Sequence, residues 1–120
     1  MAFLGARAEP GFELFARFAK LEKHLRAAAV VITGEGRIDD SSFMGKGVGE
    51  IARRCRQERI PCIALAGNIR ARLAVKGLEA HSLVELTNVA KAKSHPALWL
   101  QRLAARTARE WAKPASASAR

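Results

Sequence analysis

The stretch Ala29-Val30-Val31-Ile32-Thr33-Gly34-Glu35-Gly36 decides the fold of this chain. Its first four residues are apolar, include β-branched side chains and show no polar alternation. A run of this kind is typical of a strand that is covered on both faces, as in a parallel sheet. The closely spaced glycines after it predict a turn. We therefore expect a buried strand over residues 29–32 that ends in a glycine-rich loop.

Two more segments are predicted to be strands. Residues 62–66 form another uninterrupted apolar run, which Gly67-Asn68 closes. Residues 82–86 are less apolar, and we expect them to lie nearer an edge of the sheet. Helical spacing of apolar residues predicts the segments between the strands. The predicted helices cover residues 11–25, 47–58, 69–76 and 96–113.

This alternation of helices and strands predicts an α/β fold, a small parallel three-stranded sheet with flanking helices. We expect residues 1–113 to form this α/β domain. Residues 114–120 are small and polar, and we expect them to form a disordered tail. Because three strands leave both edges of the sheet open, we expect further chain to complete it in a larger protein.

Composition is ordinary except for charge. The 120 residues are 49% hydrophobic and 27% charged, which suits a single globular domain, but the net charge is +10. A charge of this sign favours anionic partners. A small basic module that binds nucleic acid or another polyanion, without catalysis, is therefore the alternative function. We expect most arginines, among them Arg53 and Arg54, to lie on solvated helix faces.

The two cysteines, Cys55 and Cys62, lack the spacing of a zinc site and do not form a disulfide framework. We expect both to be reduced and to pack in the core of a cytosolic protein. No apolar run approaches the roughly 20 residues that a membrane-spanning helix needs. The sequence thus predicts a cytoplasmic protein without a membrane partner.

The loop after the first strand carries the side chains with the most chemistry. Ligands of open parallel sheets bind beyond the carboxyl ends of the strands. Glu35 and Asp39 are suited to hold Mg²⁺ or to accept a proton from a hydroxyl group. Lys46 follows Gly45 near a helix N-terminus, which favours anions. The combination suits a phosphorylated or carboxylated ligand with a metal, and a purely structural turn is the alternative interpretation.

The string Val31-Ile32-Thr33-Gly34-Glu35-Gly36-Arg37-Ile38-Asp39, with two hydroxyl residues and Gly45-Lys46 after it, resembles the signature of the bacterial glycerate kinase family. Residues 60–67 resemble the next strand of that family. Weaker matches over residues 3–14 and 77–80 keep the same order, so the resemblance spans residues 3–112. The chain departs from the commonest pattern at Ser41-Ser42, where Gln-Thr would stand, and at residues 47–49.

The resemblance implies transfer of the ATP γ-phosphoryl group to D-glycerate, with Mg²⁺, by a two-domain α/β protein. This chain would be its C-terminal portion and would contribute part of the active site. The resemblance leaves open which hydroxyl of glycerate is phosphorylated. It also leaves open the oligomeric state, for which a homo-oligomer is one alternative. The expected catalytic residues are Glu35, Asp39 and Lys46, with Glu35 and Asp39 also as metal ligands; the expected substrate- and phosphate-binding residues are Gly34, Gly36, Arg37, Ser42, Gly45 and Asn68.

Overall fold

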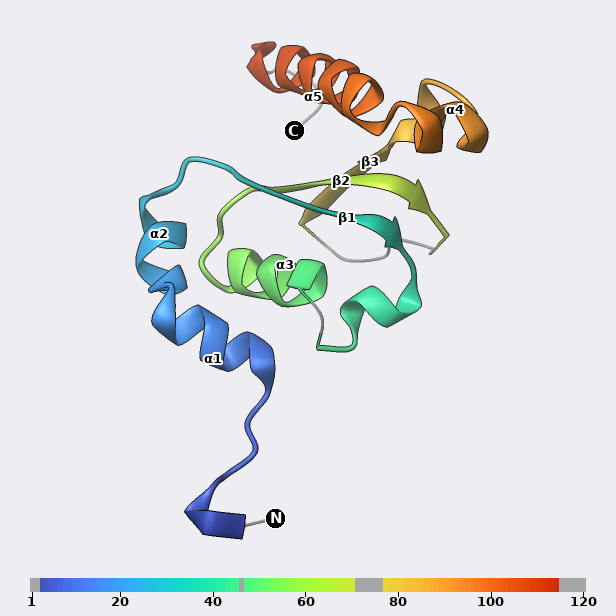
Figure 1. The fold of residues 1–120 in the computed structure, drawn as a ribbon. Helices are drawn as coiled ribbons and strands as arrows, with labels where there is room; N and C mark the ends of the chain where they lie inside the picture. Colours follow the sequence, from blue (N-terminus) through green and yellow to red (C-terminus); the bar gives the residue numbers. More distant parts are fainter. Residues whose placement is uncertain (1–2, 46, 71–76, 115–120) are drawn as a thin grey trace.

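The computed structural model describes residues 3–45, 47–70 and 77–114 of the chain. Figure 1 shows how its helices and strands are arranged. The α-helices are α1 (Gly11–Phe18), α2 (Leu21–Ala27), α3 (Gly47–Gln57), α4 (Val89–Ser94) and α5 (Pro96–Ala112); the strands are β1 (Val31–Ile38), β2 (Cys62–Ile69) and β3 (Leu78–Ser82); short 3-10 helices are η1 (Phe3–Gly5), η2 (Asp40–Phe43) and η3 (Leu83–Glu85). Within the described residues, no helix is long and apolar enough to span a bilayer.

The three strands of the described chain form one parallel sheet in the order β1-β2-β3. Figure 1 shows α3 on one face of this sheet and α4 with α5 on the other, while α1 and α2 lie beside α3. The predicted fold class, a small parallel sheet with flanking helices, is confirmed. Both β1 and β3 lie at an edge of the sheet, a position that was expected for the third strand. The helix predicted over residues 69–76 and the tail after residue 114 fall almost wholly outside the described residues.

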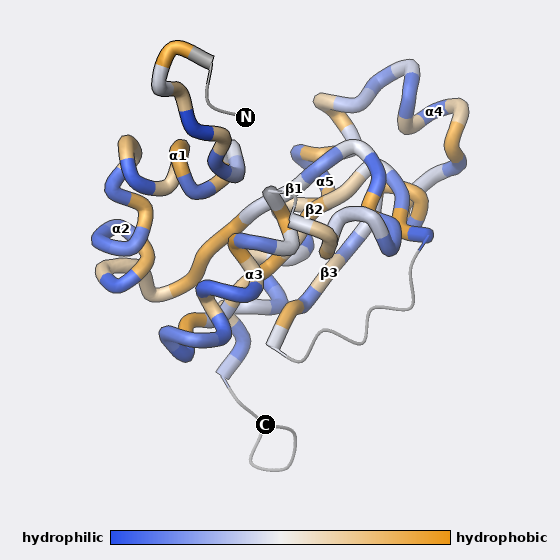
Figure 2. The backbone as a smooth tube through the Cα atoms, turned by 90° about the horizontal axis from the view of Figure 1, so that it is seen from below, coloured by the Kyte–Doolittle hydropathy of each residue, from blue (hydrophilic) through white to orange (hydrophobic). Residues whose placement is uncertain are grey.

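Apolar side chains form a cluster on each side of the sheet. On the α3 face, Ile38, Val48, Ala64 and Ala66 are buried together. On the other face, Leu83, Ala92 and Leu103 pack between η3, α4 and α5. In Figure 2 the backbone entering β1 is continuously hydrophobic, whereas the helices mix hydrophobic and hydrophilic residues. Of the three strands, β2 is the one with a mostly buried run, as its apolar residues predict. The expectation that β1 is covered on both faces is wrong, because its residues alternate in exposure and Ile32 is largely exposed.

A third cluster joins Leu25 of α2 to both cysteines. Cys55 and Cys62 are buried and not disulfide-bonded, which confirms their predicted place in the core. Burial raises the pKa of the Cys62 thiol to about 12, with the neighbouring Cys55 adding to the effect. A thiol with so high a pKa stays protonated near pH 7 and is a poor nucleophile.

Strand β1 is longer than the sequence predicts. The expected glycine-rich turn is wrong in its first part, because residues 34–38 continue the strand and pair with β2. Gly34 lies so close to the neighbouring strand that a Cβ there would fall under 3.0 Å from the Leu65 carbonyl oxygen. A Cβ on Gly67 would stand 2.5 Å from the Gly36 carbonyl oxygen. These glycines are therefore needed for close backbone approach inside the sheet and not for a turn.

We expect Gly34→Ala to lower the free energy of unfolding by about 2 kcal/mol, because the new methyl group meets backbone that cannot move aside. The matched control is Gly36→Ala, where a Cβ would meet nothing within 4 Å. This variant should change stability by less than about 1 kcal/mol. Urea unfolding followed by circular dichroism measures both. Equal stability of the two variants would contradict the close approach at Gly34.

The third strand was predicted in the wrong place. It covers Leu78–Ser82 and not residues 82–86, so most of the predicted segment is the 3-10 helix η3. Ser82 ends the strand because it forms a capping box with Glu85, whose carboxylate accepts the Ser82 backbone N–H at 2.7 Å. Leu83, which looked like a strand residue, is buried against α5.

The predicted helix over residues 11–25 is two helices. The chain breaks at Lys20, which has a left-handed backbone with φ of 51°. Its predicted apolar stripe is buried only at its end, since Leu25 is buried whereas Phe18 is 78% exposed. The break turns Leu25 toward the cysteine cluster.

A second correction concerns Arg54 of α3, which was expected in solvent. Its side chain is only 6% exposed and pairs with glutamates of α1 and α2.

Candidate functional site

An acid–serine network occupies the end of β1 and the start of η2; it consists of Glu35, Asp39, Ser41 and Ser42. The Ser42 hydroxyl donates to Oε1 of Glu35 and accepts the backbone N–H of Asp39 at 3.1 Å. Ser41 donates to Oδ1 of Asp39 twice, through its backbone N–H at 3.0 Å and its hydroxyl at 2.5 Å. Ser42 is only 1% exposed, so the network is anchored in the protein.

Asp39 has a local structural role that the sequence did not reveal. It is the N-cap residue of η2, and it accepts from Nε of Arg37 at 3.1 Å through Oδ2. The hydrogen bond from the Ser41 hydroxyl lowers the pKa of Asp39 most, and partial burial of the carboxyl raises it. The Ser41 backbone N–H and the Arg37 guanidinium lower the pKa further, so the net shift is downward. Each of these donors favours the charged form. Asp39 is therefore an anion near pH 7 whose two oxygens are both engaged.

We expect the midpoint of the Asp39 carboxyl titration, followed by NMR, to lie below the usual value of about 3.9. Because the folded-state pKa is depressed, the stabilisation is present above about pH 4 and is lost as pH falls through the folded-state value. Ser41→Ala should move the midpoint back toward the usual value, since it removes the largest cause. Ser94→Ala, a change on exposed α4, should leave it where it is. An unshifted midpoint in the unmodified protein would contradict the network.

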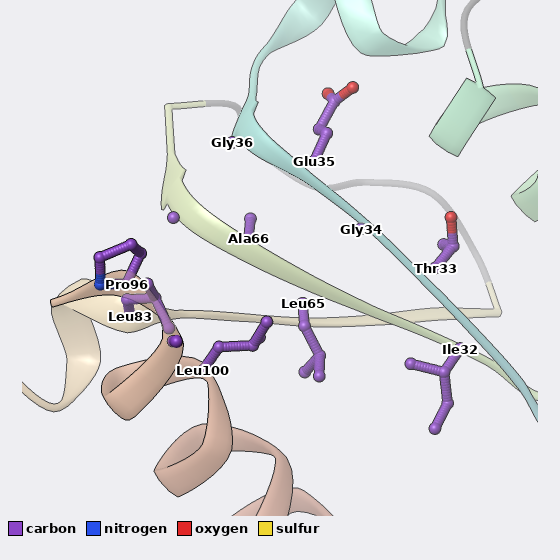
Figure 3. A pocket seen from close by; sticks show the side chains of 12 residues that line it. Ile32, Thr33, Gly34, Glu35, Gly36, Leu65, Ala66, Leu83, Pro96 and Leu100 are labelled. Carbon is purple, nitrogen blue, oxygen red and sulfur yellow. The ribbon is translucent and has the colours of Figure 1, made fainter. Parts of the chain in front are cut away.

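Two hollows lie on the opposite side of the sheet, under α4 and α5. The first, which we call the apolar hollow, has a volume of about 510 Å³ and extends from β1 to α5. Figure 3 shows the side chains of Ile32, Leu65 and Leu100 on this side. The Thr33 and Glu35 side chains point the other way. Glu35 therefore contributes backbone to the apolar hollow and its carboxylate to the acid–serine network.

The second, which we call the cationic hollow, has a volume of about 440 Å³ and lies where β1 and β2 end. Its polar side chains are those of Arg37, Asn68, Arg70 and Lys93. The sequence predicted Arg37 and Asn68 as binding residues, and the structure brings them together here. Arg70 and Lys93 were missed. Arg70, two residues past Asn68, stood near a predicted site, but Lys93 belongs to α4, which no apolar periodicity had indicated.

The structure thus separates the predicted site residues into two groups. The carboxylates and Ser42 form the network on the α3 side, whereas Gly34, Gly36, Arg37 and Asn68 line the hollows. Arg37 joins the groups through its ion pair with Asp39. Gly45 lies in the loop before α3 with φ of 79°, a conformation that suits glycine. Lys46 lies outside the described residues.

A Mg²⁺ site is only partly provided by the protein. Across residues 3–45, 47–70 and 77–114, no group of three acidic, histidine or cysteine side chains converges as a metal would require. Mg²⁺ bound with a nucleotide commonly uses one or two carboxylates, with substrate phosphates and water as its other ligands. Glu35 and Asp39 fit that smaller role, although Ser42 engages one oxygen of Glu35 and both oxygens of Asp39 have donors.

Comparisons with known proteins agree on one group. The model of the Glycerate kinase family matches residues 1–112. The chain is 42% identical over 72 residues to a Glycerate 2-kinase of Escherichia coli, covering 58% of this chain and 18% of that protein. It is 39% identical over 69 residues to a Glycerate kinase of Halalkalibacterium halodurans (58% and 18%) and 32% identical over 83 residues to one of Bacillus cereus (67% and 22%). The match thus spans about a fifth of these relatives. No solved structure matches significantly.

Proposed function

The chain belongs to the glycerate kinase family, and from this membership we propose that it forms part of the active site of an ATP-dependent glycerate kinase. The enzyme transfers the γ-phosphoryl group of ATP to a hydroxyl of D-glycerate, and yields a phosphoglycerate and ADP. The observation that carries the proposal is the acid–serine network, which links Glu35 of β1 to Asp39, the residue just after the strand end, in the segment that resembles the family signature. Ligand sites of parallel sheets lie at such ends.

The two carboxylates take different roles in this proposal. Both oxygens of Asp39 are engaged by Ser41 and Arg37, so Asp39 positions η2 and the Arg37 guanidinium. Glu35 is half-buried and engaged by Ser42 through Oε1. Glu35 accordingly orients the attacking glycerate hydroxyl and accepts its proton. Ser42 holds the Glu35 carboxylate in place for this task.

Positive charge completes the site. Phosphoryl transfer depends on positioning and on neutralising charge on the transferred group. Arg37, fixed by Asp39, neutralises phosphate or the glycerate carboxylate, and Lys46 is proposed to do the same. Glu35 and Asp39 would help to hold Mg²⁺, which would supply further charge neutralisation when bound. Gly34, Gly36 and Gly45 let the ligand approach the backbone, and Asn68 offers an amide at the end of β2.

The activity is tested on the natural polypeptide. This term means the present segment together with any further chain that is synthesised with it. We expect ADP release that requires D-glycerate, with a phosphomonoester product visible by phosphorus NMR. Release of ADP without glycerate, or none at all, would overturn the proposal. Residues 1–120 by themselves should show no turnover, because the matched segment spans only about a fifth of the family's glycerate kinases.

The alternative of a polyanion-binding module gains no support from the comparisons, which name glycerate kinases among the relatives. We propose that the positive charge instead serves an anionic substrate and nucleotide. A cytoplasmic location is also part of the proposal, since two reduced cysteines are buried in the core.

A further inference from the structure

Among the described residues, three positive side chains from separate parts of the chain line the cationic hollow. Arg37 comes from β1, Arg70 from the residue after β2, and Lys93 from α4. Arg70 is held beside β1 because its backbone N–H donates to the Ile38 carbonyl oxygen at 2.8 Å. Asn68 adds an amide to the same hollow. Residues so far apart in the chain converge here only because the strand ends and α4 pack together.

The charge of this hollow is poorly compensated. None of the described residues that line it is acidic. Among the described residues, Arg37 pairs with Asp39, whereas no carboxylate lies within ion-pairing distance of Arg70 or Lys93. Like charges that converge without counter-charges repel each other, and an anionic ligand relieves that repulsion. An Arg guanidinium and a Lys ammonium are the usual donors to phosphate oxygens.

The cationic hollow and the apolar hollow adjoin. Both are lined by Gly36, Gly67, Leu83 and Pro96. The two glycines bring bare backbone to the junction, and each hollow has a volume within the usual range for ligand sites. One ligand with a flat apolar part and an anionic part would therefore fill both.

We propose that these hollows bind the nucleotide, with its base in the apolar hollow and its phosphate chain in the cationic hollow. The inference rests on the proposed function, because it locates the ATP of that reaction. The base packs against Ile32, Leu65 and Leu100 under α5. The phosphates pass Gly36 and meet Arg70 and Lys93. Arg37 lies at the end nearest the acid–serine network, since its guanidinium is bound to Asp39.

The test measures equilibrium binding to the natural polypeptide by isothermal titration, with ATP, inorganic tripolyphosphate, adenosine and D-glycerate as separate ligands. Arg70→Gln and Lys93→Gln should each weaken ATP and tripolyphosphate about fivefold, as suits an exposed cation, and the double variant roughly 20-fold. Adenosine should be unaffected by either. Ile32→Thr keeps a β-branched residue at a site that is 65% exposed. It should weaken ATP and adenosine but not tripolyphosphate.

The matched control is the double variant Lys91→Gln/Arg109→Gln, which removes the same charge from α4 and α5 outside the hollow. It should change ATP affinity less than about twofold. Unchanged ATP affinity in Arg70→Gln/Lys93→Gln, or a loss confined to glycerate, overturns this inference. If those variants also keep glycerate-dependent ADP release and the KM for ATP, the proposed function stands without it. If the unmodified polypeptide neither binds ATP nor releases ADP, both are overturned.

Discussion

Glu35→Gln should lower kcat/KM for glycerate at least about 100-fold in the natural polypeptide. The substitution keeps the shape of the side chain and an oxygen that accepts from the Ser42 hydroxyl, but it removes the negative charge. A single electrostatic partner of a transition state is worth about 3 kcal/mol, and a neutral amide cannot accept the proton of the attacking hydroxyl. We expect the loss mainly in kcat, because the charge acts on the reacting groups. Steady-state kinetics with saturating ATP measure it.

The matched control for this prediction is Glu79→Gln. Glu79 also lies in a strand of the sheet, but it is exposed and pairs with His81. Its substitution should leave kcat/KM within about twofold of the unmodified enzyme. Thermal unfolding of both variants shows whether the sheet is intact. Full activity of Glu35→Gln would remove Glu35 from the reaction and leave the acid–serine network with a structural role.

Arg54→Ala should destabilise the fold by about 1–3 kcal/mol, because it removes a buried guanidinium together with its hydrogen bonds to glutamates and its packing. The Arg54 side chain is 6% exposed and lies 2.5 Å from Glu13, 3.3 Å from Glu22 and 4.0 Å from Glu50. Its guanidinium also stacks over the Phe12 ring at 4.9 Å. These contacts tie α1 and α2 to α3. Removal of one arginine thus disrupts three helices, and urea unfolding of the natural polypeptide measures the loss.

Arg53→Ala is the control for this second prediction. Arg53 is the preceding residue on α3 and bonds to Glu50 at 3.0 Å, but its side chain is 48% exposed. An exposed pair of this kind contributes less than about 1 kcal/mol. The two neighbouring arginines should therefore differ several-fold in their effect on the unfolding free energy. Similar losses from both would mean that burial of Arg54 does not decide its contribution.

The positions of β1 and β2 could be predicted in part because their sequence signal is local. Residues 31–32 and 62–66 are continuous apolar runs, although only the second is mostly buried, and α3 carries its apolar face at the expected helical spacing. Elements whose signal depends on distant residues were misplaced. A glycine pair predicts a turn unless a neighbouring strand passes close to it, as β2 does at Gly34. Strand β3 is half-exposed and only weakly apolar, so the capped helix after it looked more strand-like.

The candidate site was predicted in part for the same reason. The signature residues are close in sequence, so their presence at one strand end followed from the position of the strand. The sequence did not predict that these residues divide between the two sides of the sheet. That division depends on the direction of each side chain in a strand that continues through the glycines. Arg70 and Lys93 were missed because nothing nearby in the sequence marks them. Only the packing of α4 over the strand ends brings Lys93 to Arg37 and Asn68.

By itself, the sequence determined that this chain is a parallel α/β unit with an acid- and hydroxyl-rich segment at the end of its first strand. Apolar runs and helical spacing are properties of short segments, and they suffice for that conclusion. The tertiary structure alone decided that Arg54 is buried, that the Glu35 carboxylate belongs to the acid–serine network and that Arg37, Arg70 and Lys93 share one hollow. Each of these depends on burial and contact between segments far apart in the chain, which a local pattern does not encode.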